Sequence, residues 1–236
     1  MRKAKLSVRV IFVLAAAMLA SGARASTQDR CARLPGGRDV SVAVTVRRPL
    51  TAFRVPGHGA LARFGPLNVN GVDTIFRALG STCDGRWLHV QLPLRPNGAA
   101  GWVRADHVRL STVRTRIVVD LSERALRFYR RGKLVLRSST AVGSSATPTP
   151  TGRYYVSQRL IPPAPGGPFG PGAIGISAFS PVLTGWAQGG PVAIHGTNEP
   201  WSIGRAVSNG CIRLPNGVDR RLFSQAREGT PVIIEP

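Results

Sequence analysis

The chain has 236 residues and a formal net charge of +21, from 32 Lys and Arg against 11 Asp and Glu. Such an excess attracts polyanions, but the basic residues are scattered and form no recognised nucleic-acid-binding module, so we predict no nucleic-acid partner. The sequence has no phosphate-binding glycine loop at a strand-to-helix junction and no metal-ligand spacing of His, Cys, Asp and Glu. It therefore also argues against a nucleotide cofactor and a metal.

The first 25 residues have the organisation of a secretory signal peptide. Basic residues precede an apolar run over Val10–Ala20, shorter than a membrane span of about 20 residues, and Ala23-Arg24-Ala25 supplies small residues for cleavage. We predict export to the periplasm, the cell wall or the exterior, with cleavage after Ala25; the alternative is an uncleaved membrane anchor. Loss of the five basic residues of this segment leaves a charge of +16, which favours cell-wall polymers and acidic lipid headgroups as partners.

The three cysteines are Cys31, Cys83 and Cys211. In an oxidising compartment two of them pair, and the one left over is the reactive one. We predict a disulfide between Cys31 and Cys83 and a free thiol at Cys211. The alternative is that Cys31 and Cys83 are buried free thiols.

Residues 26–112 alternate short apolar stretches with turns, which is the pattern of a small all-β domain. The expected strands are Val40–Val46, Leu67–Val69, Thr74–Phe76, Trp87–Leu92 and Gly101–Val103. Pro96-Asn97-Gly98 predicts a turn, because proline presets φ and Asn and Gly tolerate positive φ. The run from Arg86 to Val103 resembles bacterial SH3-like modules. The resemblance implies a small β-barrel that binds the cell wall; the alternative is a spacer.

Residues 113–236 also predict a mainly β domain, a β-sandwich or a β-barrel-like fold with one short helix. The expected strands are Thr115–Leu121, Arg124–Tyr129, Leu134–Val142, Arg153–Ser157, Ala173–Phe179, Val192–His195 and Pro231–Ile234. The helix is expected over Gly217–Arg227, where apolar residues share one face. Leu160–Gly172 is rich in proline and glycine and predicts a loop.

A cysteine, a histidine and an arginine lie in a short glycine-punctuated stretch near the C-terminus: Cys211, His195 and Arg213. A thiol with an ordinary pKa of about 8.5 is only ~3% ionised at neutral pH, so a nucleophilic cysteine needs a base or a nearby cation. We expect His195 to take the proton of Cys211 and Arg213 to bind a substrate carboxylate. The backbone N–H groups of Gly210 and Cys211 are candidate oxyanion-hole donors. The alternative is a buried structural cysteine.

The residues around Cys211 closely resemble the signature of the bacterial L,D-transpeptidases. The matching positions are His195, Gly196, Gly204, Ser208, Gly210, Cys211, Ile212, Arg213 and Leu214. Asn209 departs from the signature, because many members have histidine there. Upstream, Thr149–Val156 resembles a Thr-Pro-Thr-Gly segment that leads into a strand in that family. The resemblance covers residues 114–236.

This resemblance implies an SH3-like β-barrel followed by an L,D-transpeptidase catalytic domain that acts on peptidoglycan stem peptides. Cys211 would form a thioester, and a second stem would resolve it to give a cross-link. The resemblance also implies that a backbone carbonyl orients His195 and that Leu160–Gly172 covers the site as a lid; the alternative for this loop is a passive connection. The candidates for the oxyanion hole and for substrate binding are together Asn209, Gly210, Arg213, Gly196 and Ser208.

Two other functions remain open. In an L,D-carboxypeptidase, water resolves the same thioester and the stem peptide is trimmed rather than cross-linked. In a catalytically silent wall-binding protein, both domains act as adhesive modules. Reaction of Cys211 with an acylating reagent separates the enzymes from the silent protein.

Overall fold

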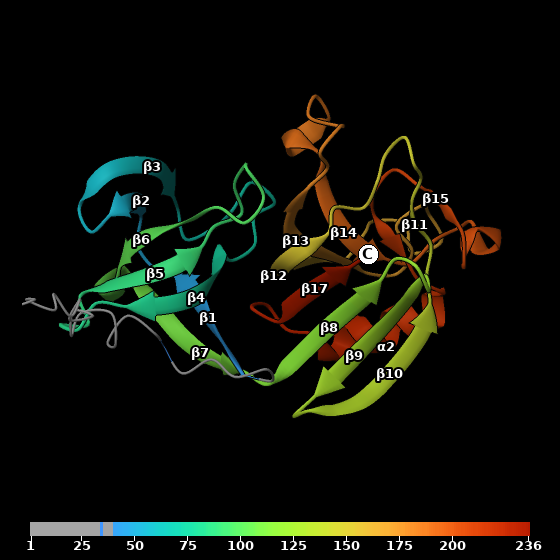
Figure 1. The fold of residues 1–236 in the computed structure, drawn as a ribbon, viewed down its shortest axis with the longest axis horizontal. Coiled ribbons are helices and arrows are strands. Elements are labelled where there is room, and N and C mark those ends of the chain that lie inside the picture. Colours follow the sequence, from blue (N-terminus) through green and yellow to red (C-terminus); the bar gives the residue numbers. More distant parts are fainter. Residues whose placement is uncertain (1–33, 35–39) are drawn as a thin grey trace, which may run out of the picture.

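The computed structural model describes residue 34 and residues 40–236. The predicted signal peptide and Cys31 lie outside these residues, whereas Cys83 is disulfide-bonded. Two large β-sheets stand side by side in Figure 1, and a short two-stranded sheet lies beside the second. The predicted mainly β fold is confirmed. Within the described part of the chain, no helix has the length and apolar character needed to cross a membrane.

The first sheet has seven strands in the order β3-β2-β6-β5-β4-β1-β7. They are β1 (Ser41–Val46), β2 (Leu50–Val55), β3 (His58–Phe64), β4 (Ile75–Ser81), β5 (Trp87–Gln91), β6 (Ala100–Arg104) and β7 (Val108–Val113), with a 3-10 turn at Ala105–His107. Alternate residues of β4 and β6 are buried, and Phe76, Val90 and Val103 are fully buried in one core. Strands β1, β5 and β6 agree with the sequence prediction to within one residue.

The predicted strand Leu67–Val69 is wrong. Leu67 forms only an isolated bridge with Asp73, and the Asn68 side-chain oxygen accepts the Asn70 N–H at 2.8 Å. This local bond stabilises a turn rather than a ladder, and Val69 is 83% exposed. By contrast, the predicted turn at 96–98 is present: Gly98 has a φ of +85°, and β5 and β6 pair on either side of it.

The second sheet has eight strands in the order β10-β9-β8-β17-β12-β13-β14-β16. They are β8 (Thr115–Asp120), β9 (Ala125–Arg130), β10 (Lys133–Ser139), β12 (Gly152–Leu160), β13 (Ala173–Phe179), β14 (Pro191–His195), β16 (Ile212–Arg213) and β17 (Pro231–Glu235), with β11 (Val142–Gly143) and β15 (Ala206–Ser208) in the two-stranded sheet and 3-10 turns at Ala187–Gly189 and Pro200–Ser202. The α-helix α2 (Asn216–Gln225) packs Leu222 into the same core as Ile117 and Phe128. The two predicted hairpins, β8–β9 and β9–β10, are confirmed.

The two sheets are held together by buried contacts between β4 and β12. Tyr155 is fully buried and packs with Ala43, Ile75 and Val113, and its hydroxyl donates a hydrogen bond of 3.1 Å to the Ile75 carbonyl. A second bond, of 2.7 Å, runs from the Gln91 side chain to a backbone carbonyl of β12. The first sheet is therefore fixed against the sheet that carries the cysteine motif.

Replacing Tyr155 with phenylalanine should reveal how much this contact stabilises the protein. The change leaves the buried Ile75 carbonyl without its donor, and we expect a loss of about 1–3 kcal/mol in the free energy of unfolding. Urea denaturation measures it. Tyr129→Phe is the matched control, because the half-buried Tyr129 ring packs on Arg116 and its hydroxyl makes no hydrogen bond to a described residue. Equal losses in both variants would contradict the role given to Tyr155.

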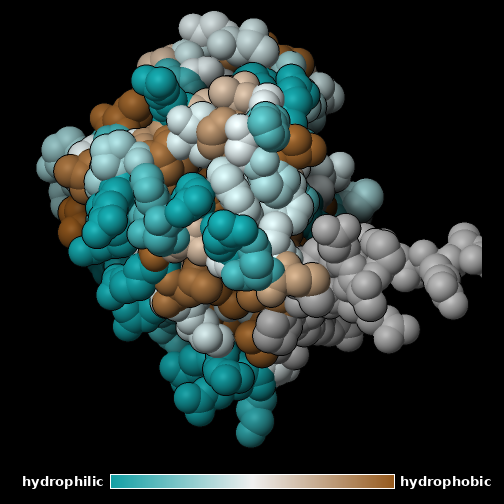
Figure 2. All heavy atoms as spheres, turned by 90° about the vertical axis from the view of Figure 1, so that its left-hand side faces the viewer, coloured by the Kyte–Doolittle hydropathy of each residue, from teal (hydrophilic) through white to brown (hydrophobic). Residues whose placement is uncertain are grey.

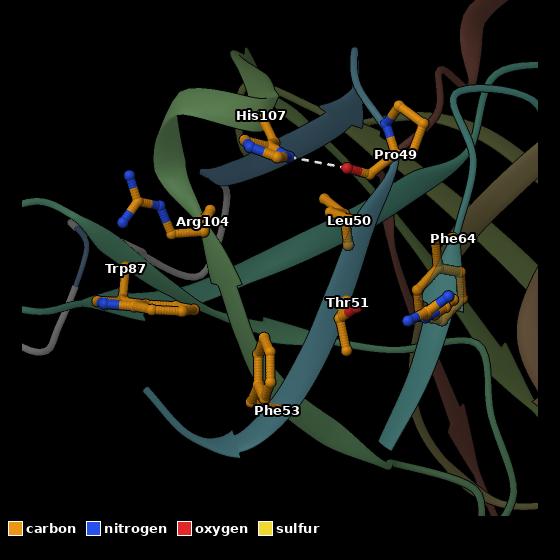
Figure 3. Close-up of a pocket in the computed structure, with 9 residues that line it drawn as sticks. Pro49, Leu50, Thr51, Phe53, Phe64, Trp87, Arg104 and His107 are labelled. Atoms are coloured by element: carbon orange, nitrogen blue, oxygen red, sulfur yellow. Dashed lines mark hydrogen bonds between the residues drawn. The ribbon is translucent and has the colours of Figure 1, made fainter. Parts of the chain in front are cut away.

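A cavity of about 490 Å³ opens on the first sheet, lined by side chains of β2, β3, β5 and β6 (Figure 3). Phe53 and Trp87 meet edge to face with ring centroids 5.8 Å apart, and the Arg104 guanidinium lies 5.7 Å from the Trp87 ring. Figure 2 shows this end of the molecule as hydrophilic with scattered hydrophobic patches. No residue of the cysteine motif lines the cavity.

Candidate active site

Two short parallel strands bring the two halves of the motif together. Strand β14 ends at His195, and β16 pairs with it in parallel, with Ile194 opposite Ile212 and His195 opposite Arg213. This register places Cys211, the residue before β16, opposite Ala193 in β14. Because side chains alternate between faces along a strand, Cys211, Arg213 and His195 lie on the same face of the pair.

Cys211 is a free, partly buried thiol. Its Sγ atom accepts a hydrogen bond of 3.4 Å from the Ala193 N–H. Burial raises the pKa of the Cys211 thiol, and the Ala193 N–H and the Arg213 charge only partly oppose this effect. The thiol is therefore protonated at neutral pH, and it needs a base before it can act as a nucleophile.

His195 is only 3% exposed, and its Nδ1 atom lies 2.5 Å from the Gly196 carbonyl oxygen. A carbonyl can only accept, so Nδ1 carries the proton and Nε2 keeps a free lone pair. Burial is the main cause that lowers the pKa of His195 to about 4; the Arg213 charge adds to it, and the Gly196 carbonyl opposes it. The imidazole is therefore neutral at pH 7 and can accept a proton.

Arg213 lies between the site and a carboxylate that the sequence analysis left without a role. Its Nη1 atom forms an ion pair with Glu199, whose side chain is 43% exposed while that of Arg213 is 19% exposed. A substrate carboxylate that binds Arg213 must share it with Glu199 or displace it. The two residues lie 14 positions apart in the chain, so local sequence patterns do not predict their contact.

Ser208 and Gly210 shape the loop that presents the thiol. Gly210 has a φ of +107°, a conformation that favours glycine, and its N–H donates a hydrogen bond of 3.1 Å to Ser208 Oγ. Ser208 Oγ in turn donates to the Cys211 carbonyl at 2.6 Å, and Ser208 is 1% exposed. Without substrate, both groups form bonds within the loop, so their predicted roles in the oxyanion hole and in substrate binding would require these bonds to change.

Thr147 and Thr149 hydrogen-bond to the backbone of this loop. Thr149 Oγ1 donates to the Gly210 carbonyl at 2.9 Å and accepts the Gly143 N–H at 2.8 Å. Thr147 Oγ1 donates to the Ser208 carbonyl at 2.9 Å. These bonds connect the Thr-Pro-Thr-Gly segment to the loop before Cys211 and fix its backbone.

Gly196 and Asn209 differ in their placement. Asn209 is exposed next to the thiol loop, whereas Gly196 is buried. A Cβ atom at Gly196 would lie 2.3 Å from Asn216 Oδ1 and 2.9 Å from the Gly170 backbone. Packing therefore requires glycine at 196.

The predicted loop between β12 and β13 reaches the site at its C-terminal end. The Phe169 ring meets the His195 ring edge to face, with centroids 5.1 Å apart, and Gly170 is buried against Gly196. The loop therefore covers one side of the histidine. Among the described residues, no group of three or more His, Cys, Asp and Glu could hold a metal ion.

The model of the YkuD family, L,D-transpeptidase catalytic domain, matches residues 114–234. The chain belongs to the L,D-transpeptidase family. The putative L,D-transpeptidase YkuD of Bacillus licheniformis is 43% identical to this chain over 125 residues, which are 53% of this chain and 68% of the relative. YkuD of Bacillus subtilis is 37% identical over 123 residues, covering 52% of this chain and 67% of the relative.

Solved structures of this family are similar as well. The L,D-transpeptidase of Enterococcus faecium, solved as a mutant, has 29% sequence identity and a TM-score of 0.38, with 51% of this chain and 49% of that chain covered. The catalytic domain of the E. faecium L,D-transpeptidase has 26% identity and a TM-score of 0.37, with 51% of this chain and 95% of that chain covered. The chain thus spans about half the length of the first of these proteins.

Asp219 is a buried acid near the candidate site. It lies in the first turn of α2 and is 0% exposed. Gly172 and Gly196 N–H groups face its carboxylate, but no described residue makes a hydrogen bond of standard geometry to it. Burial raises the pKa of Asp219 to about 7. The family resemblance assigns no triad role to Asp219, because it implies that a backbone carbonyl orients His195.

The raised pKa of Asp219 predicts how stability depends on pH. An unfolded aspartate releases its proton near pH 4, whereas the folded protein retains it to about pH 7, so the folded state loses stability as pH rises through this window. We expect Asp219→Asn to remove this dependence and to gain up to about 4 kcal/mol relative to the unmodified protein at pH 8. Urea unfolding from pH 4 to pH 8 measures it, with the exposed Asp73→Asn as control. Parallel curves for all three proteins would refute this prediction.

Proposed function

We propose that this L,D-transpeptidase cross-links peptidoglycan stem peptides through a thioester on Cys211, with His195 as the general base. One observation carries the proposal: Cys211 and His195 lie on one face of β14 and β16, and Nδ1 of His195 is bound to the Gly196 carbonyl. Nε2 is then the nitrogen that remains to take the thiol proton. Family membership supports the reaction class.

The first half of the reaction breaks an amide bond. Nε2 of His195 takes the Sγ proton as Sγ attacks the carbonyl carbon of the stem's L-centre, and the C=O electrons move to oxygen. When the tetrahedral intermediate collapses, the C–N bond to the terminal D-residue breaks, and the imidazolium returns the proton to the leaving amine. Enzyme thioester and a free D-amino acid are the products.

The second half forms the cross-link. A side-chain amine of a second stem attacks the thioester carbonyl and gives its proton to Nε2 of His195. The C–S bond then breaks, the sulfur takes the proton back from His195, and a new amide joins the two stems. If water replaces the amine, the product is a trimmed stem, which is the carboxypeptidase reaction.

The pKa shifts of Cys211 and His195 favour a pair that is neutral before substrate binds. Burial raises the pKa of Cys211 and lowers that of His195, so neither group is ionised at pH 7. Proton transfer therefore creates charge only as the thiol attacks, and Arg213 favours the anion that forms. We propose the Cys211 N–H as the oxyanion donor, because the Gly210 N–H is already hydrogen-bonded to Ser208 Oγ.

We also propose that the protein works outside the cytoplasm, where peptidoglycan is found. The N-terminal sequence supports export, and the basic charge of the chain suits cell-wall polymers. N-terminal sequencing of the protein recovered from the envelope checks this proposal. A chain that begins after Ala25 supports cleavage, whereas an intact Met1 in the membrane fraction contradicts it.

Incubation with defined disaccharide-tetrapeptides and mass analysis of the products tests the activity. A dimer that has lost one D-residue identifies the transpeptidase, a tripeptide product identifies the carboxypeptidase, and unchanged substrate favours the silent wall-binding protein. Exposure of the intact protein to a carbapenem provides an independent check. A covalent adduct present in the unmodified protein and absent in Cys211→Ala supports the enzyme.

A further inference from the structure

The peptide group between Gly196 and Thr197 is hydrogen-bonded at both ends. Its carbonyl oxygen accepts the Nδ1–H of His195 at 2.5 Å. Its N–H, which belongs to Thr197, donates to the side-chain oxygen of Asn216 at 2.8 Å. A continuous chain therefore runs from the Asn216 amide through one peptide group to the imidazole.

The Asn216 oxygen has little freedom to leave this position. Asn216 is the first residue of α2, and its side chain fills the space left by two glycines. A Cβ atom would lie 2.3 Å from Oδ1 if added at Gly196 and 2.6 Å if added at Gly170. Thr197 is 4% exposed, so water cannot readily replace Asn216 as the acceptor for its N–H.

These contacts have two physical consequences for the histidine. A hydrogen bond to the N–H of a peptide group polarises its carbonyl and makes it a better acceptor. The same bond fixes the plane of the peptide, and rotation of that plane would turn the carbonyl away from Nδ1. Loss of the acceptor would also leave a buried N–H unsatisfied, which favours such a rotation.

We propose that Asn216 is a positioning residue that orients His195 through the Gly196–Thr197 peptide. It keeps the proton on Nδ1 and leaves Nε2 to accept the proton of Cys211. The role corresponds to that of the third side chain of a catalytic triad, with one peptide group interposed. The inference rests on the proposed function for its catalytic consequence, but its structural content concerns the imidazole alone.

The test measures the imidazole in the resting protein, without any substrate. ¹⁵N NMR of histidine-labelled protein distinguishes a protonated ring nitrogen from a bare one. In the unmodified protein we expect Nδ1 of His195 to be protonated, and in Asn216→Ala a mixture of the two neutral tautomers. Asn216→Asp keeps an acceptor oxygen at the same place and should keep the Nδ1–H tautomer.

The catalytic readout is the rate of Cys211 acylation. We expect Asn216→Ala to slow it by about 10–100-fold, the usual effect of losing a group that orients a functional histidine, and Asn216→Asp to restore most of the rate. Gly217→Ala is the matched control in the same helical turn, since an added Cβ there meets nothing within 4 Å. It should leave both tautomer and rate unchanged.

Several outcomes would overturn the inference. They are an unchanged Nδ1–H tautomer in Asn216→Ala, a failure of Asn216→Asp to keep it, and equal slowing in Gly217→Ala. If Asn216→Ala does not fold, Asn216→Ser replaces it, because a serine side chain is too short for its hydroxyl to reach the Thr197 N–H. If the unmodified protein is never acylated, the proposed function fails, while the tautomer comparison still decides the role of Asn216.

Discussion

Cys211→Ala should form no cross-linked product and no thioester from stem peptides, whereas its affinity for the peptide should change little. Among the described residues Cys211 is the free thiol, and alanine offers no atom that can bond to the carbonyl carbon. Any residual hydrolysis comes from the remaining binding groups, so we expect turnover to fall by at least about 10⁴-fold. Muropeptide conversion followed by mass spectrometry measures this loss.

Cys211→Ser gives a sharper comparison than alanine alone. The hydroxyl is smaller and far less acidic than the thiol, so the same neutral imidazole removes its proton much less readily. We expect it to behave as the alanine variant does in turnover, and both variants should keep the bond from the Ser208 hydroxyl, because it involves only the backbone carbonyl of residue 211. Turnover by either variant within tenfold of the unmodified protein would exclude Cys211 as the nucleophile.

His195→Ala should acylate Cys211 about 10²–10⁴-fold more slowly than the unmodified protein, which is the usual contribution of a positioned general base. The raised pKa of the Cys211 thiol makes the loss large at neutral pH, because little thiolate forms without a base. Raising the pH should partly rescue the variant, since hydroxide then supplies the thiolate. The rate of acylation by a carbapenem, measured from pH 3 to pH 10, shows both effects.

In the same experiment, the acylation rate of the unmodified protein should fall at acid pH. His195 has a pKa of about 4, so the neutral base persists down to that pH, and the acylation rate should fall only as pH drops through about 4. An ordinary histidine would give a limb near pH 6.5. The exposed His58→Ala is the control, and a His195→Ala rate equal to that of the control would exclude His195 as the base.

The sequence predicts the mainly β fold because many strands are long enough to show their pattern. Strand β13 agrees with its predicted range, and α2 agrees to within two residues. The two- and three-residue strands β16 and β15 were not predicted, because so few residues carry no periodicity. Yet β16 is what aligns Cys211 with His195, so the pairing that builds the site could not be obtained from local patterns.

The candidate site was predictable where chemistry depends on residue type, and not where it depends on backbone geometry. Cys211 and His195 are recognisable because a thiol nucleophile needs a base. The bonds that use Ser208, Thr149 and Asn216 act on backbone groups, and nothing in their spacing indicates which carbonyl or N–H they meet. For the same reason, the sequence does not predict that the Gly210 N–H donates to Ser208 Oγ.

The most direct measurement is to trap the acyl-enzyme. The protein is mixed with a tetrapeptide-bearing muropeptide, quenched in acid within the first turnover, digested, and mapped by mass spectrometry. We predict that the peptide containing Cys211 gains the mass of the substrate less its terminal D-residue, and that hydroxylamine removes it. The proposed role of Cys211 is contradicted if cross-linked product accumulates while Cys211 stays unmodified at every quench time. It is also contradicted if the acyl group is found on another residue.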